Sequence, residues 1–156
     1  MDRIDFKILA ALQTDARLSM VELSHQVGLS KTPCTARVKR LERDGVIRGY
    51  HADLDPVALG VNHIVVVQVL LSSTTERDLR RFNDAVQLIP QIVSCHMIAG
   101  DFDYLLIVRT RDVGEYRRVM GEQISGLPCV KQTHSYVAME VVKDAPRLTI
   151  SAPESA

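Results

Sequence analysis

The sequence contains no tryptophan, few other aromatic residues and no low-complexity run, and its aliphatic content is that of a soluble globular protein. No apolar run approaches the ~20 residues that a membrane-spanning helix needs. The N-terminal residues, MDRIDFK, are charged and lack the apolar core of a secretory signal. We therefore expect a cytoplasmic protein that is neither secreted nor embedded in a membrane.

Cysteine is also scarce. Cys34, Cys95 and Cys129 have no metal-ligand spacing and are odd in number, so we expect free thiols in a reducing cytoplasm. The histidines are scattered along the chain, and no metal site is expected. No nucleophile and base stand near paired carboxylates in the sequence, which argues against an enzyme, and nothing indicates a cofactor.

Charge is balanced over the whole chain but not along it. Of the 19 basic and 19 acidic residues, nine basic and six acidic ones lie in residues 1–50. The remainder is correspondingly acidic. A small basic part joined to a larger acidic part suggests two domains with different roles.

The basic part begins with two predicted helices. The first covers residues 2–15, and the second opens with the capping box SMVE at residues 19–22 and ends at Gly28, a residue suited to a left-handed turn. Their apolar positions at helical spacing are Ile4, Ile8, Leu9, Leu12, Val21, Leu23 and Val27. Each helix is therefore expected to bury one face.

A third helix follows the short GLS turn. Ser30 is expected to cap it, and it continues to about Asp44. Its apolar face, formed by Cys34, Val38 and Leu41, is expected to pack on the other helices. Two helices joined by so short a turn, the second strongly basic, are typical of a helix-turn-helix.

The opposite face of this third helix is basic. A solvated face is the plain alternative, since most charge runs are of that kind. The order of residues favours DNA, because small polar side chains precede the bases, as in helices whose first residues contact base edges while Lys and Arg hold phosphates. The candidate DNA-contacting residues are Lys31, Thr32, Thr35, Arg37, Lys39 and Arg40.

The segment VIRGYHADLDP, residues 46–56, has the pattern of short extended pieces broken by Gly49 and Pro56. It is expected to form either a wing beside the helices or a hairpin that links the two parts. The assigned ranges are 1–50 for the helix-turn-helix domain, 51–62 for a hairpin linker, 63–145 for the second domain and 146–156 for a C-terminal tail.

The acidic part alternates strand and helix patterns. The expected strands are residues 63–73, 91–100, 104–110 and 130–143. The expected helices open at capping boxes over residues 73–76 and 112–115, and prolines at positions 90 and 128 end these regions. The order β-α-β-β-α-β is the ferredoxin-like arrangement, so the fold class is α+β.

Two of the predicted strands are apolar at every position. In that topology both helices lie on one side of the sheet, yet residues 64–67 and 105–108 require burial on both faces. A few hundred Å² of exposed aliphatic sheet is rare on a monomer. We expect the sheet of a second subunit to cover the open face, and a linker folded over it is the alternative.

The GDFDY sequence, residues 100–104, is expected to form a hairpin loop with two carboxylates. Thr133 and Ser135, alternate residues of the last strand, place two hydroxyls on one face of the sheet. An ordinary turn is the simplest interpretation, although hydroxyls, loop amides and a carboxylate together suit a small zwitterion. The candidate effector-binding residues are Met97, Gly100, Asp101, Phe102, Asp103, Thr133 and Ser135.

These motifs together resemble the Lrp/AsnC family, the leucine-responsive and asparagine-type transcription regulators. The resemblance covers Ile4 to Lys143 and includes the opening DRIDFKILAALQTDAR, the segment VGLSKTPCTARVKRLERDGVIRGY, the AGDFDYLL loop and the THSYVAMEVVK strand. The G-x-(F/Y)-D loop of the family is matched by Gly100, Phe102 and Asp103, and its T-x-S by Thr133 and Ser135. The TPC sequence at residues 32–34 is similar to that of a subgroup controlling amino-acid catabolism.

The resemblance implies a winged helix-turn-helix, a hairpin linker and a C-terminal effector domain of the RAM or AsnC type. Family members dimerise through that domain, often form octamers as tetramers of dimers, and bind amino acids where neighbouring effector domains meet. The implied function is that of a sequence-specific transcription regulator that binds double-stranded DNA and responds to an amino acid, with an aliphatic one favoured by the apolar residues near the loop. The alternatives are an architectural DNA-wrapping protein with little ligand response and a small enzyme.

Overall fold

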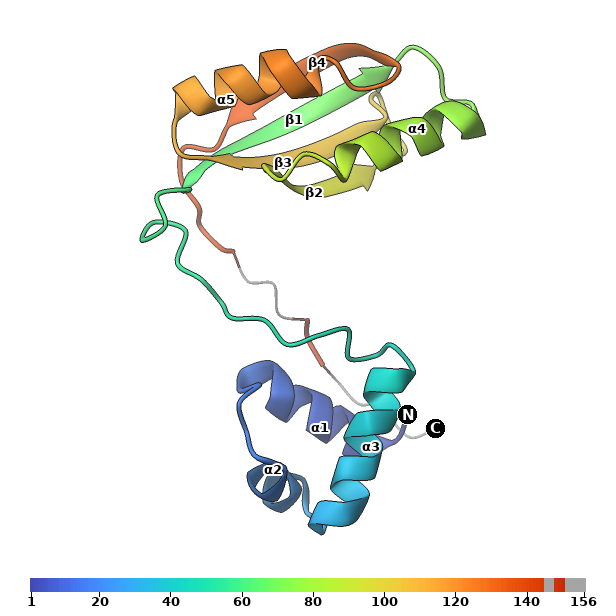
Figure 1. The fold of residues 1–156 in the computed structure, drawn as a ribbon, viewed down its shortest axis with the longest axis vertical. Coiled ribbons are helices and arrows are strands. Elements are labelled where there is room, and N and C mark those ends of the chain that lie inside the picture. The colour runs from blue at the N-terminus through green and yellow to red at the C-terminus, as the bar shows by residue number, and fades with distance from the viewer. Residues whose placement is uncertain (145–147, 151–156) are drawn as a thin grey trace. The chain divides into compact units, whose positions relative to one another are not determined.

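The structure is a computed structural model that describes residues 1–144 and 148–150. The chain divides into two compact units, one that contains residues 1–53 and one that contains residues 54–142 (Figure 1). No helix among the described residues is long and apolar enough to cross a membrane. The expected tail at 146–156 lies almost entirely outside the described residues.

The first unit consists of three helices, α1 (Arg3–Thr14), α2 (Met20–Val27) and α3 (Lys31–Arg43). Apolar side chains of all three helices meet in one small core, as the helical spacing predicted. The buried apolar members of this core are Ile8, Leu12, Leu23, Val27, Cys34, Val38 and Leu41. The order of helices and the short connection between α2 and α3 are those of a helix-turn-helix.

The ends of α2 agree with the sequence, but two details differ. Ser19 and Glu22 form the expected capping box, and Gly28 ends the helix with a left-handed φ of 76°. Ser30 has the extended backbone of a helix cap, yet its side chain makes no capping hydrogen bond, so that expectation is wrong. Val21 is 47% exposed and not part of the core, because it lies on the outer face of this short helix.

Residues 46–62 contain no strand, so neither a wing nor the hairpin expected at 51–62 forms within this chain. The physical reason is that an extended segment is a strand only when a neighbouring strand accepts its hydrogen bonds, and none lies beside it here. Residues 56–60 form a turn instead, and the Val61 amide donates to the Pro56 carbonyl. Directly before the expected linker, the Tyr50 hydroxyl donates to Glu42 of α3.

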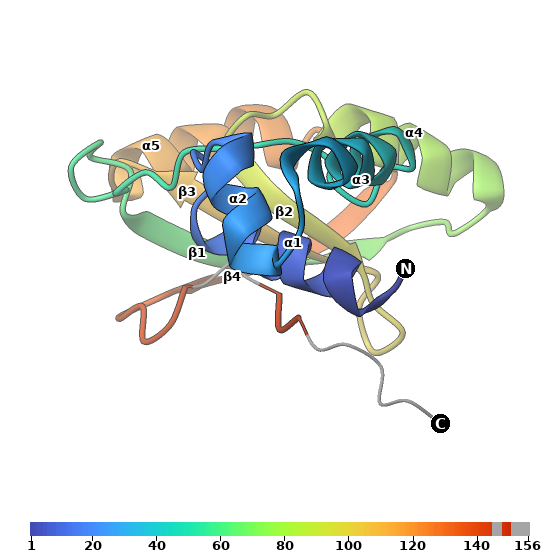
Figure 2. The ribbon, with the colours of Figure 1, turned by 90° about the horizontal axis from the view of Figure 1, so that it is seen from below.

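The second unit has the predicted β-α-β-β-α-β order. Its elements are β1 (His63–Leu71), α4 (Glu76–Val86), β2 (Ile92–Met97), β3 (Tyr104–Thr110), α5 (Val113–Val119), the π-helical turn η1 (Met120–Ile124) and β4 (Val130–Val137). The four strands form one antiparallel sheet in the order β2-β3-β1-β4. Both helices lie on the same face of this sheet (Figures 1 and 2).

Several boundaries of the second unit differ from those predicted. Strand β1 ends at Leu71 and not at residue 73, and β2 covers Ile92–Met97 and not residues 91–100. The N-cap of α4 is Thr75, whose hydroxyl accepts from the Asp78 amide, and Ser73 instead donates its hydroxyl to the Asp78 carboxylate. Strand β4 ends at Val137 and does not continue to residue 143. Its last contacts are to the beginning of β1, and the described residues provide no partner strand beyond that point.

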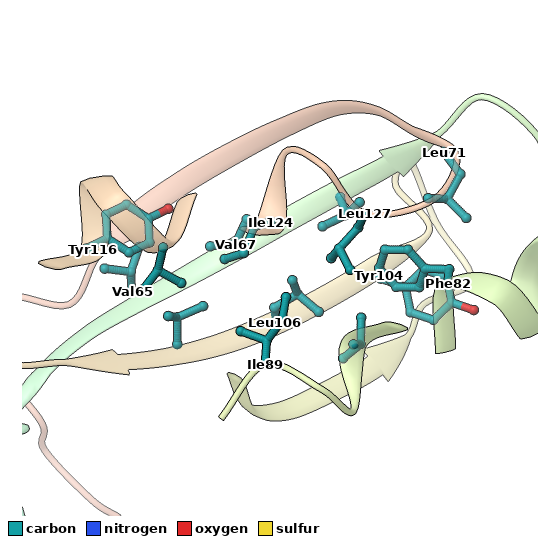
Figure 3. Close-up of a cluster of buried hydrophobic side chains, with 14 residues drawn as sticks. Val65, Val67, Leu71, Phe82, Ile89, Tyr104, Leu106, Tyr116, Ile124 and Leu127 are labelled. Carbon is teal, nitrogen blue, oxygen red and sulfur yellow. The ribbon is translucent and has the colours of Figure 1, made fainter. Parts of the chain in front are cut away.

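The core of the second unit lies between the sheet and its two helices (Figure 3). Alternate residues of β1 and β3, including Val67 and Leu106, point into it, and the rings of Phe82 and Tyr104 stack with centroids 4.4 Å apart. This alternation fixes which residues occupy the other face of the sheet.

Within the second unit, none of the described helices lies on the other face of the sheet (Figure 2). By the strand register, it presents the intervening residues of the two central strands, which are mostly aliphatic and only partly buried in this chain. These residues, here called the open face, are Ile64, Val66, Gln68, Leu70, Leu105, Ile107 and, at one end, Arg109. The sequence predicted aliphatic residues on both faces of β1 and β3, and the structure agrees. One face packs against the helices, and the other is the open face.

Candidate DNA-binding surface and effector site

The candidate DNA-binding surface is the exposed side of the N-terminal half of α3. Its side chains surround a shallow hollow lined by Lys31, Thr32, Thr35, Ala36 and Lys39. Because Cys34, Val38 and Leu41 turn toward the core, the helical period places these residues outward. Four of the six predicted DNA-contacting residues therefore share one accessible surface.

The polar groups on this surface are available to a partner in different ways. The Thr35 hydroxyl donates to the Lys31 carbonyl at 2.8 Å, so its oxygen remains able to accept. Thr32 is exposed at the beginning of the helix, and Lys39 is exposed one turn beyond Thr35. Within the described part of the chain, neither Lys31 nor Lys39 takes part in an ion pair. Hydroxyls and unpaired ammonium groups are suited to base edges and phosphates respectively.

The other two predicted DNA-contacting residues, Arg37 and Arg40, are occupied within the domain. The Arg37 guanidinium lies 2.7 Å from an Asp2 oxygen and 2.8 Å from an Asp5 oxygen. Arg40 lies 2.6 Å from the second Asp5 oxygen. The spacing of charges within α3 does not reveal these pairs, because Asp2 and Asp5 come from the beginning of α1.

The carboxylates of this group are held in the ionised form. The backbone amide of Asp5 and the Arg37 guanidinium lower the pKa of Asp2 below its ordinary value of 3.8. Burial would raise the pKa of Asp5, but the Asp2 amide and the two arginines more than offset this, and its pKa is lowered. The same contacts raise the pKa of Arg37. Asp2, Asp5 and Arg37 are therefore charged at neutral pH.

The candidate effector loop joins β2 to β3. The Ile98 amide donates to the Asp103 carbonyl at 2.8 Å and closes the turn, as predicted for a hairpin. The Asp103 carboxylate does not point away from the protein, because it accepts the Leu71 amide at the end of β1 at 2.7 Å. Its own amide donates to the Val69 carbonyl. Asp103 thus attaches the loop to the neighbouring strand.

The remaining loop residues are more accessible. Gly100 and Asp101 are exposed, Phe102 is partly buried, and Met97 is 60% exposed at the end of β2. A Cβ atom added at Gly100 would make only an ordinary contact with Ile98, at 3.6 Å. The fold of a single chain therefore does not require glycine at this position.

Thr133 and Ser135 lie on the helix-covered face of β4, as the strand register with Val69 and Val67 shows. The Ser135 hydroxyl is 2.5 Å from the Tyr116 hydroxyl of α5. Met97 and Thr133 stand at opposite edges of the sheet, with β3 and β1 between them, so three strand spacings of about 4.8 Å separate their backbones. The structure does not bring the loop end of β2 and the hydroxyls of β4 together within one chain.

Other kinds of site find little support. The described residues contain no cluster of three or more potential metal ligands, and the three cysteines form no disulfide. Burial raises the pKa of the Cys34 and Cys95 thiols. No reactive thiolate is therefore indicated at either position.

A helix-turn-helix unit joined to a ferredoxin-like unit defines a class of two-domain regulators, and comparison with known proteins gives the family. Residues 1–48 match the model of a winged helix-turn-helix DNA-binding domain, and residues 64–148 match that of the Lrp/AsnC ligand-binding domain. The chain belongs to the Lrp/AsnC family of DNA-binding transcription regulators, which combine a DNA-binding domain with an amino-acid-binding domain.

Similar proteins include a proline dehydrogenase transcriptional activator from Rhizobium radiobacter, 54% identical over 92% of each chain. The leucine-responsive regulatory protein of Escherichia coli K12 is 49% identical over 96% of this chain and 92% of its own. An AsnC family regulator from Agrobacterium tumefaciens has the same fold with a TM-score of 0.90 at 38% identity, covering 96% of this chain and 97% of that one. A regulator from Neisseria meningitidis solved with L-methionine is 30% identical, with a TM-score of 0.87 over 96% of each chain.

Proposed function

We propose that this protein controls transcription in response to a small aliphatic amino acid that binds between effector domains of neighbouring copies. The observation that carries the proposal is the separation of the predicted site residues. One chain offers an exposed loop with the carboxylate of Asp101 at one place and the hydroxyls of Thr133 and Ser135 at another. A ligand that contacts Met97 and Thr133 together would have to span three strand spacings within one chain, which favours a site shared by two copies.

Each part of the proposed site has a chemical role. Asp101 is the loop carboxylate left for the ammonium group of the ligand, since Asp103 already accepts the Leu71 amide. The exposed amides around Gly100 and the hydroxyl of Thr133 are suited to the ligand carboxylate. Met97 and Phe102 supply apolar surface for the ligand side chain, which favours an aliphatic amino acid over a charged one.

Proline is the first effector to test. Two relatives, 54% and 50% identical, are proline dehydrogenase transcriptional activators. Proline is a small apolar zwitterion and satisfies the chemistry of the loop. Leucine and methionine are the next candidates, because relatives include leucine-responsive regulatory proteins and a regulator solved with L-methionine.

The proposed assembly is a dimer formed through the open face, with higher assembly to an octamer of four dimers. The open face is aliphatic at its centre and only partly buried in one chain. Such a surface on a monomer is unusual, and burial against a second sheet stabilises it. The relatives are transcription regulators, and a non-enzymatic role is part of this proposal.

The architectural alternative shares the DNA-binding surface but requires no ligand response. Calorimetry with proline, leucine, methionine and a charged control such as lysine tests the proposal directly, and footprinting with and without the bound amino acid follows. We expect one aliphatic ligand to bind and to change the footprint. If no amino acid changes DNA binding, and the footprint is extended with little sequence preference, the architectural role would be supported instead.

A further inference from the structure

An ionic cluster joins the beginning of α1 to the recognition helix α3. We call it the Asp5 cluster, and it consists of Asp2, Asp5, Arg37 and Arg40. Asp5 lies at its centre and is only 1% exposed. Its Oδ1 accepts from Arg37 at 2.8 Å, and its Oδ2 accepts from Arg40 at 2.6 Å and from the Asp2 amide at 2.9 Å.

We propose that Asp5 is a positioning residue for DNA recognition. It holds α3 in a fixed orientation against α1 through Arg37 and Arg40, and these two arginines serve the clamp instead of neutralising DNA phosphates. The proposal depends on the DNA-binding role of α3 and is independent of the effector site.

The burial of Asp5 supports this division of roles. A carboxylate that is removed from water must keep its ionic and hydrogen-bonding partners, because leaving a buried charge unpaired is strongly unfavourable. If Arg37 and Arg40 moved to DNA phosphates, both oxygens of Asp5 would lose a charged partner. Contacts to phosphates, which remain solvated, do not compensate for that loss.

The clamp also restricts how α3 can move. The apolar core fixes one side of the helix through Cys34, Val38 and Leu41, whereas Arg37 and Arg40 tie a second side to α1. Two attachments on different sides of one helix prevent its rotation about its own axis. Thr32 and Thr35 are thereby presented to DNA in a constant orientation.

The clamp separates Arg37 and Arg40 from Lys31 and Lys39, and the two pairs have different expected effects on DNA binding. Lys31 and Lys39 border the hollow on the outer face and belong to no ion pair among the described residues. These two lysines are therefore expected to release counterions on binding. Each such contact contributes about one to the slope of log K against log salt concentration.

The first experiment compares Arg40→Ala with Lys39→Ala in the full-length protein, by measuring affinity for one operator over a range of salt concentrations. Lys39→Ala is expected to lower the salt slope by about one. Arg40→Ala is expected to weaken binding by the same factor at every salt concentration and to leave the slope unchanged. A slope lowered by about one in Arg40→Ala would overturn the proposal.

The second experiment removes the acid. Asp5→Asn and the control Asp44→Asn make the same change of charge, but Asp44 is an exposed residue at the end of α3 paired with an exposed Arg43. If only net charge mattered, both variants would bind DNA as tightly as the parent or more tightly. We expect Asp5→Asn alone to weaken binding, and to have little further effect when Arg37 and Arg40 are already replaced by alanine.

Circular dichroism at the assay temperature confirms that each variant is folded before affinities are compared. Arg40→Gln removes the charge but keeps a donor for Asp5, and it replaces Arg40→Ala if the latter unfolds. Tighter binding by Asp5→Asn, equal to that of Asp44→Asn, would show that the arginines are available to DNA and would overturn the clamp.

Discussion

The Leu71 amide donates a 2.7 Å hydrogen bond to the carboxylate of Asp103, so the candidate effector loop is attached to β1 by one of its own acidic residues. Leu71 is buried at the end of β1, next to the irregularity in its pairing with β4. The geometry of the loop and the end of the sheet are therefore coupled. Of the two loop carboxylates, this gives Asp103 a structural role that Asp101 does not have.

The Asp103→Ala variant is expected to lose stability as well as ligand response. Removal of the carboxylate leaves the Leu71 amide without its partner, which costs about 1–3 kcal/mol for a buried donor. Asp101→Ala serves as the control, because Asp101 is exposed and should affect only the ligand. Chemical unfolding and calorimetry on both variants provide the test. Equal stability of the two variants would contradict the structural role of Asp103.

The α3 surface is expected to divide into residues that select sequences and residues that provide affinity. Thr32→Ala should change which bases are preferred, with about 1–3 kcal/mol of discrimination lost at the affected position. Lys39→Ala should weaken binding to all sequences alike. Selection from a library of randomised operators measures both effects. Identical preferences in Thr32→Ala and the parent would remove Thr32 from the group of base-contacting residues.

The sequence predicted the local elements of this fold well, because their causes are local. The capping box at Ser19, the left-handed Gly28 and the whole of β3 follow from residues within a few positions of one another. Ser73 was the wrong choice of cap for α4, since Thr75 satisfies the same pattern two residues later. Linker strands could not be predicted reliably, because a strand depends on a partner that the pattern does not identify.

The sequence predicted which residues belong to the candidate sites, but not which side chains contact one another there. The pairing of Arg37 and Arg40 with acids was not predicted, because Asp2 and Asp5 lie 32 to 35 positions earlier, beyond the reach of helical periodicity. The sequence did contain an indication of this pairing. Arg37 and Arg40 are three positions apart, so they share one side of the helix and can contact the same acidic residue. The contact between Asp103 and Leu71 depends on strand pairing, which no spacing within the loop could reveal.

Gly28 provides a test of the turn in the helix-turn-helix. Its φ of 76° lies in the left-handed region, and a Cβ added there would meet no atom within 4 Å. Gly28→Ala should therefore lower the free energy of unfolding only through the left-handed backbone conformation, by about 1–2 kcal/mol. Gly28→Asn should cost less, because asparagine tolerates this region better. Thermal unfolding of both variants checks the order, and equal losses would contradict it.

The Asp5 cluster is also expected to contribute to acid stability. The pKa of Asp5 is lowered below its ordinary value of 3.8 in the folded protein. The contribution of Asp5 to the free energy of unfolding is therefore complete above pH 3.8, and it is lost as the pH falls through the lowered pKa. In Asp5→Asn this contribution is absent, so the free energy of unfolding should depend less steeply on pH below 3.8, by at most about 1.4 kcal/mol per pH unit.

Chemical unfolding from pH 7 to pH 2.5 measures this effect, with Asp44→Asn as the control, because both variants lose one carboxylate. The relevant quantity is the difference in slope between each variant and the parent. If Asp5→Asn and the parent lose stability in parallel below pH 3.8, the cluster does not hold Asp5 ionised.

The open face is expected to be the surface through which two copies associate. Val66 and Ile107 are directly paired across β1 and β3 at its centre. Val66→Asp places a charge where the proposed partner would remove it from water, which should weaken the dimer by about 3–5 kcal/mol. Val67→Asp, one position later, points into the core and should unfold the domain instead. The two variants thus separate association from folding.

Val113→Asp is the matched control, since Val113 is 63% exposed at the start of α5 and is not part of the open face. Sedimentation equilibrium at micromolar concentration gives the mass of each variant, and circular dichroism reports its folding. We expect Val113→Asp to behave as the parent, and Val66→Asp to be folded but monomeric. A folded dimer in Val66→Asp, or a monomeric parent, would show that the two sheets do not meet and that the aliphatic face is covered in some other way.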